Sequence, residues 1–181
     1  MRQPREATAE QHHQLDELTV PLPQGAAIAD PDVIEAYRRD QARSVPAGHP
    51  LAVVRATATA DVQAVMRWAD RHRVPVVPRG AGSGLSGGAY ALDGSIVLDL
   101  SSMDRIVEID PVEQLAVVES GVINADVSRA AASHRLYYAP DPASWEFSTI
   151  GGNVATNAGG LCCVKYGVTG DHVLGLGRGG G

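Results

Sequence analysis

The chain has 181 residues, which is enough for one domain with its own hydrophobic core. Hydrophobic residues make up 44% and charged residues 20%, as in soluble globular proteins. Fifteen basic residues stand against 21 acidic ones, so the net charge is −6, which argues against nonspecific binding to nucleic acid or to an anionic membrane.

The two cysteines, Cys162 and Cys163, are adjacent and do not have the spacing of a zinc site or of a disulfide framework. We therefore expect no metal site and a reducing, cytoplasmic location. The segment Met1–Asp16 is polar and no run of about 18 apolar residues occurs, so we expect neither a secretory signal nor a membrane span.

The periodicity predicts an α+β pattern with a mixed sheet and flanking helices. Two short helices are expected at 11–18 and 32–43, and a loop at 46–50. A strand at 51–55, an amphipathic helix with Thr59 as its N-cap that ends near Arg73, and a strand at 74–77 suggest a parallel pair. Further strands are expected at 95–100, 105–109 and 114–119, with a helix from Asn124 to His134.

A glycine-rich loop follows the strand at 74–77. In the segment 78–88, three alternating glycines, Gly80, Gly82 and Gly84, leave successive backbone N–H groups free to face one anion, and nearby serines add donors. One interpretation is a simple surface turn. A second is the G-x-G-x-x-G fingerprint of dinucleotide-binding proteins, but that motif must open a helix, and the next strand leaves no room for one. The third is a phosphate loop held between two strands, which we favour.

A second segment, 148–160, alternates small residues with two asparagines, Asn153 and Asn157. A packed helix or strand would carry more bulk than this, and two Gly-Gly pairs beside the asparagines make a simple loop a poor explanation, so we expect this segment to approach a flat, polar ligand closely. The competing interpretation is that the asparagines only satisfy turns.

Together, the two segments resemble the FAD-binding, PCMH-type domain of the vanillyl-alcohol-oxidase family. Val76-Val-Pro-Arg-Gly-Ala-Gly-Ser-Gly-Leu85 is similar to the family's pyrophosphate loop, and Thr149-Ile-Gly-Gly-Asn-Val-Ala-Thr-Asn-Ala-Gly159, with Pro140-Asp141 upstream, is similar to its second flavin-contacting stretch. Within the family, the sequences of these segments most resemble those of glycolate oxidase and D-lactate dehydrogenase flavoproteins.

The resemblance implies FAD as the cofactor, with sixteen contacting residues in two groups: Pro78, Arg79, Gly80, Ala81, Gly82, Ser83, Gly84 and Leu85 at the pyrophosphate, and Pro140, Asp141, Thr149, Gly151, Gly152, Asn153, Asn157 and Gly159 along the cofactor toward the flavin. The loop and residues 148–160 contain no histidine, so we expect noncovalent FAD. The implied reaction is the oxidation of a D-2-hydroxy acid, such as lactate or glycolate, to the 2-oxo acid by hydride transfer to the flavin.

The resemblance also implies a domain division, with a polar segment at 1–30, an incomplete FAD-binding domain at 31–176 and a glycine-rich tail at 177–181. The tail does not continue the apolar strand that relatives have there, so we interpret the chain as a truncated fragment. The family's catalytic residues are then expected outside it, and other subunits or an electron acceptor are possible partners. Two alternatives stay open: a remnant that holds no FAD, and a branch of the same fold that reduces its substrate.

Overall fold

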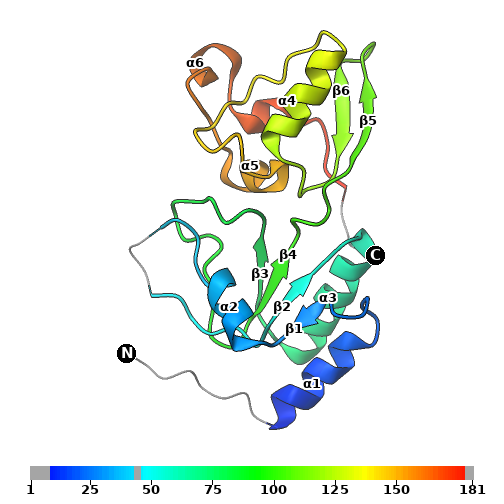
Figure 1. Cartoon of the computed structure of the whole chain (residues 1–181), viewed down its shortest axis with the longest axis vertical. Coiled ribbons are helices and arrows are strands. Elements are labelled where there is room, and N and C mark those ends of the chain that lie inside the picture. Colours follow the sequence, from blue (N-terminus) through cyan, green and yellow to red (C-terminus); the bar gives the residue numbers. More distant parts are fainter. Residues whose placement is uncertain (1–8, 43–45, 178–181) are drawn as a thin grey trace. The chain divides into compact units, whose positions relative to one another are not determined.

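The computed structural model describes residues 9–42 and 46–177, and it divides into two compact units, one that ends at Leu100 and one that begins at Ser101 (Figure 1). The expected N-terminal segment lies partly, and the expected tail almost wholly, outside the described residues. No helix in the described part of the chain is long and apolar enough to cross a membrane.

The first unit is built on a four-stranded mixed sheet. Its strands lie in the order β1 (Ala27–Ile28), β2 (Ala52–Arg55), β4 (Ile96–Asp99) and β3 (Val76–Arg79). β1 is antiparallel to β2, whereas β2 and β3 both run parallel to β4. The expected mixed sheet is confirmed. The two strands that flank the long helix run parallel, as expected, but they do not pair directly, because β4 lies between them.

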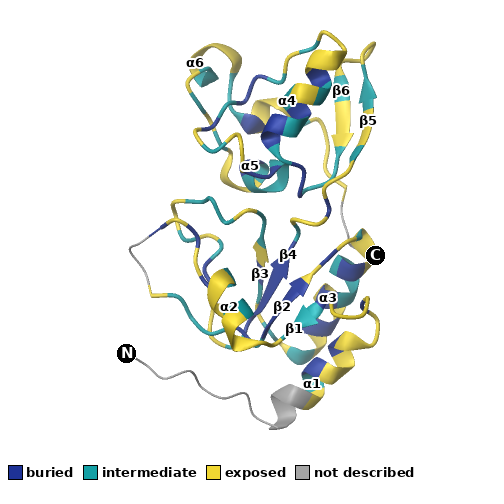
Figure 2. Cartoon of the chain, viewed as in Figure 1, coloured by how far each residue is buried: buried dark blue, intermediate teal, exposed yellow. Residues whose placement is uncertain are grey.

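The two central strands form the core of the first unit. Residues 52–54 of β2 and all of β4 are buried (Figure 2), which is typical of parallel strands that other elements cover on both faces. Val53 and Val97 pack together with Ala91, and Ile34 and Tyr37 of the helix α2 lie against them.

Three helices accompany this sheet: α1 (Ala9–Thr19), α2 (Pro31–Tyr37) and α3 (Thr59–His72). α2 starts at an Asp30 cap but ends at Tyr37, six residues before the expected end. α3 matches its prediction, except that the N-cap is Ala58 and not Thr59. The side chain of Asp61 accepts hydrogen bonds from the N–H groups of Thr57 and Ala58, at 2.8 and 3.1 Å, so it takes over the capping role.

The second unit contains an antiparallel hairpin, β5 (Ile106–Asp110) and β6 (Leu115–Val118), which confirms the two expected strands. The helix α4 (Asn124–Ser133) confirms the next prediction and carries buried residues along one side (Figure 2). The helices α5 (Ile150–Thr156) and α6 (Cys163–Tyr166) and the 3-10 helix η1 (Thr169–His172) follow.

The argument that the small residues of 148–160 speak against a packed helix is wrong, because α5 occupies the middle of this segment. Two features start and end it despite its small side chains. The hydroxyl oxygen of Thr149 accepts a hydrogen bond from Gly152 N at the first turn. Asn157 adopts the left-handed conformation at the last turn, with φ of 49°, as helix-terminating residues commonly do.

Candidate cofactor-binding site

The first glycine loop leaves the sheet at the carboxyl end of β3. Its flanking strands β3 and β4 are parallel neighbours, and no helix forms between them. The exclusion of the dinucleotide-binding fingerprint is therefore confirmed. Ligands of open sheets with parallel strands are commonly bound at this carboxyl edge.

The loop exposes a row of main-chain donors. The N–H groups of residues 80–88 donate none of the turn and loop hydrogen bonds found among the described residues, whereas those of Ala89, Tyr90 and Ala91 do. Gly82 and Gly87 have positive φ angles of 66° and 78°, a backbone conformation that glycine adopts readily and other residues rarely do. Such a run of donors is suited to a phosphate anion.

Charged and aromatic side chains meet at the same edge of the sheet. Arg55, Asp99 and Arg79 end their strands in register with one another. Tyr37 lies between the two arginines, with their guanidinium carbons 5.6 and 5.5 Å from its ring centroid, and its hydroxyl contacts Asp99 at 3.1 Å. The edge therefore carries two positive charges held against one ring.

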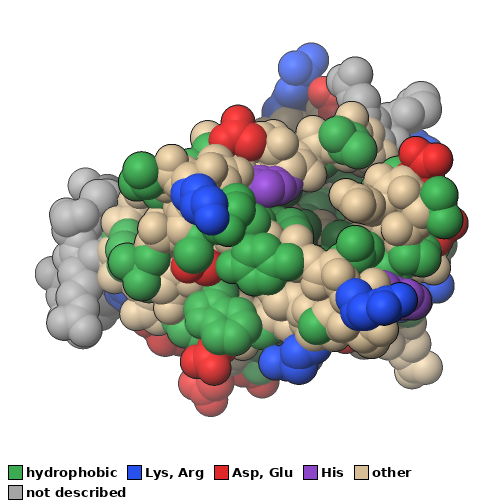
Figure 3. All heavy atoms as spheres, turned by 90° about the horizontal axis from the view of Figure 1, so that it is seen from above, with side chains coloured by type: hydrophobic (Ala, Val, Ile, Leu, Met, Phe, Trp, Pro, Cys, Tyr) green, Lys and Arg blue, Asp and Glu red, His purple; other side chains and the backbone are tan. Residues whose placement is uncertain are grey.

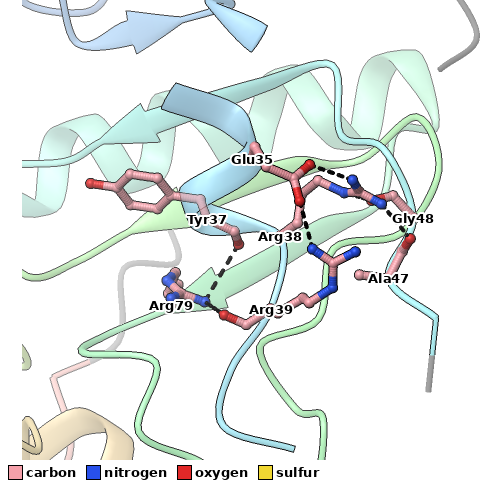
Figure 4. Close-up of polar contacts among 7 residues, drawn as sticks. All are labelled: Glu35, Tyr37, Arg38, Arg39, Ala47, Gly48 and Arg79. Atoms are coloured by element: carbon pink, nitrogen blue, oxygen red, sulfur yellow. Dashed lines mark hydrogen bonds and ion pairs between the residues drawn. The ribbon is translucent and has the colours of Figure 1, made fainter. Parts of the chain in front are cut away.

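The segment that follows α2, residues 37–42, lies along the glycine loop and binds it at several points. Arg79 Nη1 donates to the carbonyl oxygens of Tyr37 and Arg39, at 3.4 and 2.8 Å (Figure 4). The loop carbonyl of Gly84 accepts from Gln41 N at 2.9 Å. The carboxylate of Asp40 accepts from Ala42 N and, at 3.5 Å, from Ala89 N.

A second set of ion pairs fixes the same segment on its other side (Figure 4). Glu35 binds both Arg38 and Arg39, and these hydrogen bonds, the one from Arg38 first, hold the pKa of its carboxyl below its usual range. Arg38 is buried and also donates to the carbonyl oxygens of Ala47 and Gly48, at 2.8 Å each. The backing of the loop is therefore made rigid by charged hydrogen bonds.

In the second unit, Pro140 and Asp141 are held by contacts from two other segments. The buried amide of Asn124 donates to Pro140 O at 3.1 Å, and Cys162 N donates to the Asp141 carboxylate at 3.1 Å. Gly160 packs so closely on Asp141 that a Cβ added there would overlap the Asp141 backbone. Only glycine fits at this close approach.

Three buried polar atoms in the second unit have no hydrogen-bond partner: Asn124 Oδ1, Ser148 Oγ and Asn153 Nδ2. The three residues belong to segments that contact one another. Asn124 N donates to Ser148 O, Ser148 directly precedes the Thr149 cap, and Asn153 N donates to Thr149 O in the first turn of α5. A buried polar group without a partner is costly, so such atoms in a folded protein point to a ligand or an ordered water.

Asn157 and the 3-10 helix η1 are joined by a separate set of bonds. Asn157 Oδ1 accepts from Gly170 N at 2.8 Å, and Thr169 Oγ1 donates to Ala158 O at 2.7 Å. The amide oxygen of Asn157 therefore satisfies the protein's own backbone, as the competing turn interpretation expects. Asn153, by contrast, keeps an unpaired amide nitrogen.

The thiol of Cys162 lies between Asp141 and Tyr137. The hydrogen bond to the Asp141 carboxylate, together with burial, raises the pKa of this thiol against the opposing effect of the Tyr137 hydroxyl. Among the described residues, no group of three or more His, Cys, Asp or Glu side chains is placed to hold a metal ion.

The surface of the second unit carries several large apolar side chains in water. Val112, Leu161, Val164 and Leu174 are each at least 85% exposed. Figure 3 shows hydrophobic side chains on one face, interspersed with backbone, polar and charged groups.

The structure places the sixteen sequence-predicted residues in two groups. Those at 78–85 lie on the carboxyl edge of the first unit's sheet, and those at 140–159 lie around α5 in the second unit. The sequence did not reveal that residues 37–42 support the glycine loop from behind, or that Asn124 and Ser148 are buried with unpaired polar atoms. Asn124 resembled an ordinary helix cap, and the only sequence signal for the backing was a cluster of charges after a short helix.

Comparison with known proteins supports a flavoprotein assignment. Residues 50–177 match the family model described as FAD binding domain. The chain is 49% identical over 143 residues to the glycolate oxidase subunit GlcD of Escherichia coli K12, covering 79% of this chain and 27% of that protein. It is 38% identical over 162 residues to D-2-hydroxyglutarate dehydrogenase of Stutzerimonas stutzeri, covering 90% and 35%.

Among solved structures, alkyldihydroxyacetonephosphate synthase matches with a TM-score of 0.82 at 20% identity, covering 96% of this chain and 33% of that one. The chain thus spans about a third or less of the length of these relatives. The expected α+β fold of the FAD-binding PCMH type is confirmed. The chain belongs to the family of FAD binding domains.

Proposed function

We propose that this chain holds the pyrophosphate and part of the flavin of a noncovalently bound FAD in an oxidoreductase that converts a D-2-hydroxy acid to its 2-oxo acid. The observation that carries the proposal is the loop 80–88 at the carboxyl edge of a sheet with parallel strands, whose N–H groups donate none of the turn and loop hydrogen bonds of residues 9–42 and 46–177. The names of the two relatives, which refer to glycolate and to D-2-hydroxyglutarate, support the substrate class.

The residues present fit the cofactor. Main-chain donors of the loop would hold the two phosphates. A side chain at position 82 would displace Arg79, so glycine fits best there. The unpaired amide of Asn153 and the hydroxyl of Ser148 supply buried donors, as a polar ring edge requires. Of the sixteen candidates, we propose as direct contacts the loop residues through their main-chain N–H groups, and Asn153 through its unpaired side-chain nitrogen.

Bound FAD would supply the acceptor for the hydride that leaves the α-carbon of the substrate. The chain's own residues contribute binding and orientation. The charged contacts behind the loop fix its conformation before the cofactor arrives, so little conformational entropy is lost on binding. The groups that act on the substrate's hydroxyl and carboxylate are proposed to come from outside these 181 residues, together with any further subunit or electron acceptor.

The noncovalent attachment is proposed because residues 80–88 and 148–160 contain no histidine. The domain limits at 30 and 176 also stay predictions. If attachment is noncovalent, acid or heat precipitation of the loaded chain releases all flavin into the supernatant. Flavin that stays with the pellet would contradict it.

The test of cofactor binding is an absorbance titration of the purified chain with FAD. The matched variants are Gly84→Glu, which places a carboxylate in the loop, and Gly175→Glu, which makes the same charge change at an open position. We expect the wild-type chain and Gly175→Glu to bind FAD and Gly84→Glu to lose at least tenfold in affinity. A wild-type chain that ignores FAD would contradict the proposal and favour a remnant without cofactor.

A further inference from the structure

Arg79 lies within the segment that resembles a pyrophosphate loop, and a basic residue at that place suggests the role of a phosphate ligand. Its surroundings indicate a different role. The guanidinium points back from β3 toward the turn after α2 (Figure 4), where Nη1 donates to the carbonyl oxygens of Tyr37 and Arg39.

The rest of the guanidinium is also held by the protein. Its face lies 5.5 Å from the centroid of the Tyr37 ring, and Gly82 of the loop lies against Nη2 so closely that no Cβ would fit between them. Burial lowers the pKa of Arg79, while Asp99, Tyr37 and Asp40 oppose that effect. One side chain therefore joins the end of β3, the turn at 37–39 and the loop at Gly82.

The turn that Arg79 holds is also the segment that binds the rest of the loop. Gln41 N donates to Gly84 O, and Ala91 N donates to Arg38 O, at 2.9 and 3.0 Å. If the turn moves, both hydrogen bonds are lost, and the loop and the residues that follow it are no longer held against residues 38–41.

We propose that Arg79 is a positioning residue, which shapes the loop from behind by fixing residues 37–42 and does not itself bind phosphate. The part of this inference that concerns cofactor affinity rests on the proposed function. The part that concerns loop geometry does not, because it can be measured in the chain without FAD.

The experiment compares Arg79→Met and Arg79→Lys with Arg67→Met, which removes an exposed arginine of α3 whose side chain donates to Gln63 one turn earlier in the same helix. Amide hydrogen exchange of the FAD-free chain is followed by NMR at Gln41 and Ala91. Lysine keeps the charge but lacks the planar guanidinium that lies against the Tyr37 ring and Gly82 while Nη1 donates to both carbonyls. We expect both Arg79 variants to exchange at least tenfold faster at these two amides, with Arg67→Met unchanged and Val74 N, which donates to Ala69 O, unchanged throughout.

FAD affinity is then measured at several salt concentrations. We expect both Arg79 variants to bind at least tenfold more weakly than wild type, with the same dependence on salt, since no ion pair with phosphate has been removed. Unchanged exchange at Gln41 and Ala91 overturns the positioning role. So does an Arg79→Lys variant that binds FAD like wild type while Arg79→Met loses salt dependence. A wild-type chain that binds no FAD refutes the proposed function alone, because the exchange result still decides the role of Arg79.

Discussion

Alanine substitutions at three glycines of the first unit allow the cost of backbone strain to be measured apart from the cost of steric overlap. Gly82 has φ of 66° and touches Arg79; Gly94 has φ of 72° but nothing near its missing Cβ; Gly88 has open space and no positive φ. An alanine in the left-handed region costs about 1–2 kcal/mol. Gly94→Ala should therefore lower the free energy of unfolding by about 1–2 kcal/mol, and Gly88→Ala should leave it nearly unchanged or raise it slightly.

Gly82→Ala carries the same strain and also displaces the guanidinium of Arg79. Loss of a hydrogen bond with a charged donor costs about 1.5–3 kcal/mol, so the total should be about 2.5–5 kcal/mol. The overlap term is removed if Arg79 is already methionine, so in that background Gly82→Ala should cost no more than Gly94→Ala.

The assay is urea denaturation followed by the fluorescence of Trp68, which is 4% exposed in α3. The chain has two tryptophans, so a Trp145→Phe background lets Trp68 alone report on the first unit. If Gly82→Ala costs the same as Gly94→Ala with Arg79 intact, the contact between the loop and this guanidinium is not as described and the reasoning fails.

Three further predictions concern single side chains. The arginine partners of Glu35 lower its pKa, so the stability that this carboxylate contributes is present at neutral pH and is lost as the pH falls through its lowered folded-state pKa. The difference in unfolding free energy between wild type and Glu35→Gln should be under about 1 kcal/mol at neutral pH, because the group is exposed, and should vanish at acid pH. A constant difference down to acid pH would count against it. Because Asp141 raises the pKa of Cys162, Asp141→Asn should speed alkylation of this thiol by iodoacetamide at pH 8, as located by mass spectrometry; an unchanged rate would exclude the contact. Asn157→Gly should lose only the bond to Gly170, about 1 kcal/mol, while Asn157→Ala should lose about 1–2 kcal/mol more through strain, and equal costs in thermal denaturation would argue against the left-handed geometry.

The strands were predictable because the information that defines them is local. Residues 52–54 and 96–98 are continuous apolar runs bounded by turns, and both became buried central strands. Their order was not predictable. The strand at 96–99 enters between β2 and β3, and nothing in a periodic pattern reveals which strand will be its neighbour.

The errors have a common physical origin in long-range hydrogen bonds. α2 ends at Tyr37 because residues 38–42 bind the glycine loop about 45 residues further along the chain, which competes with continuing the helix. Conversely, α5 forms from small residues because Thr149 caps its start and Asn157 ends it, although its composition argued against a packed helix. Local propensity gave way to tertiary contacts in both places.

The site divides in the same way. The glycines of the first loop were recognisable from sequence, since few other functions call for three alternating glycines after a strand. Arg38, Asp40 and Asn124 were not recognisable from sequence, because each side chain forms its hydrogen bond with a residue that is distant along the chain. Residues of this kind can be assigned only once the partner's position is known.

A recognition loop whose donors all belong to the main chain has a consequence for how it responds to sequence change. Ser83, Leu85 and Ser86 can be exchanged for most other residues without removing a single N–H group, so alanine substitutions at these three positions should change binding little. Sensitivity should appear instead at positions that touch no ligand, such as Tyr37 and Arg79 behind the loop. Over evolutionary time, such a site can retain its ligand while its side chains drift, provided that the shape of the backbone is inherited.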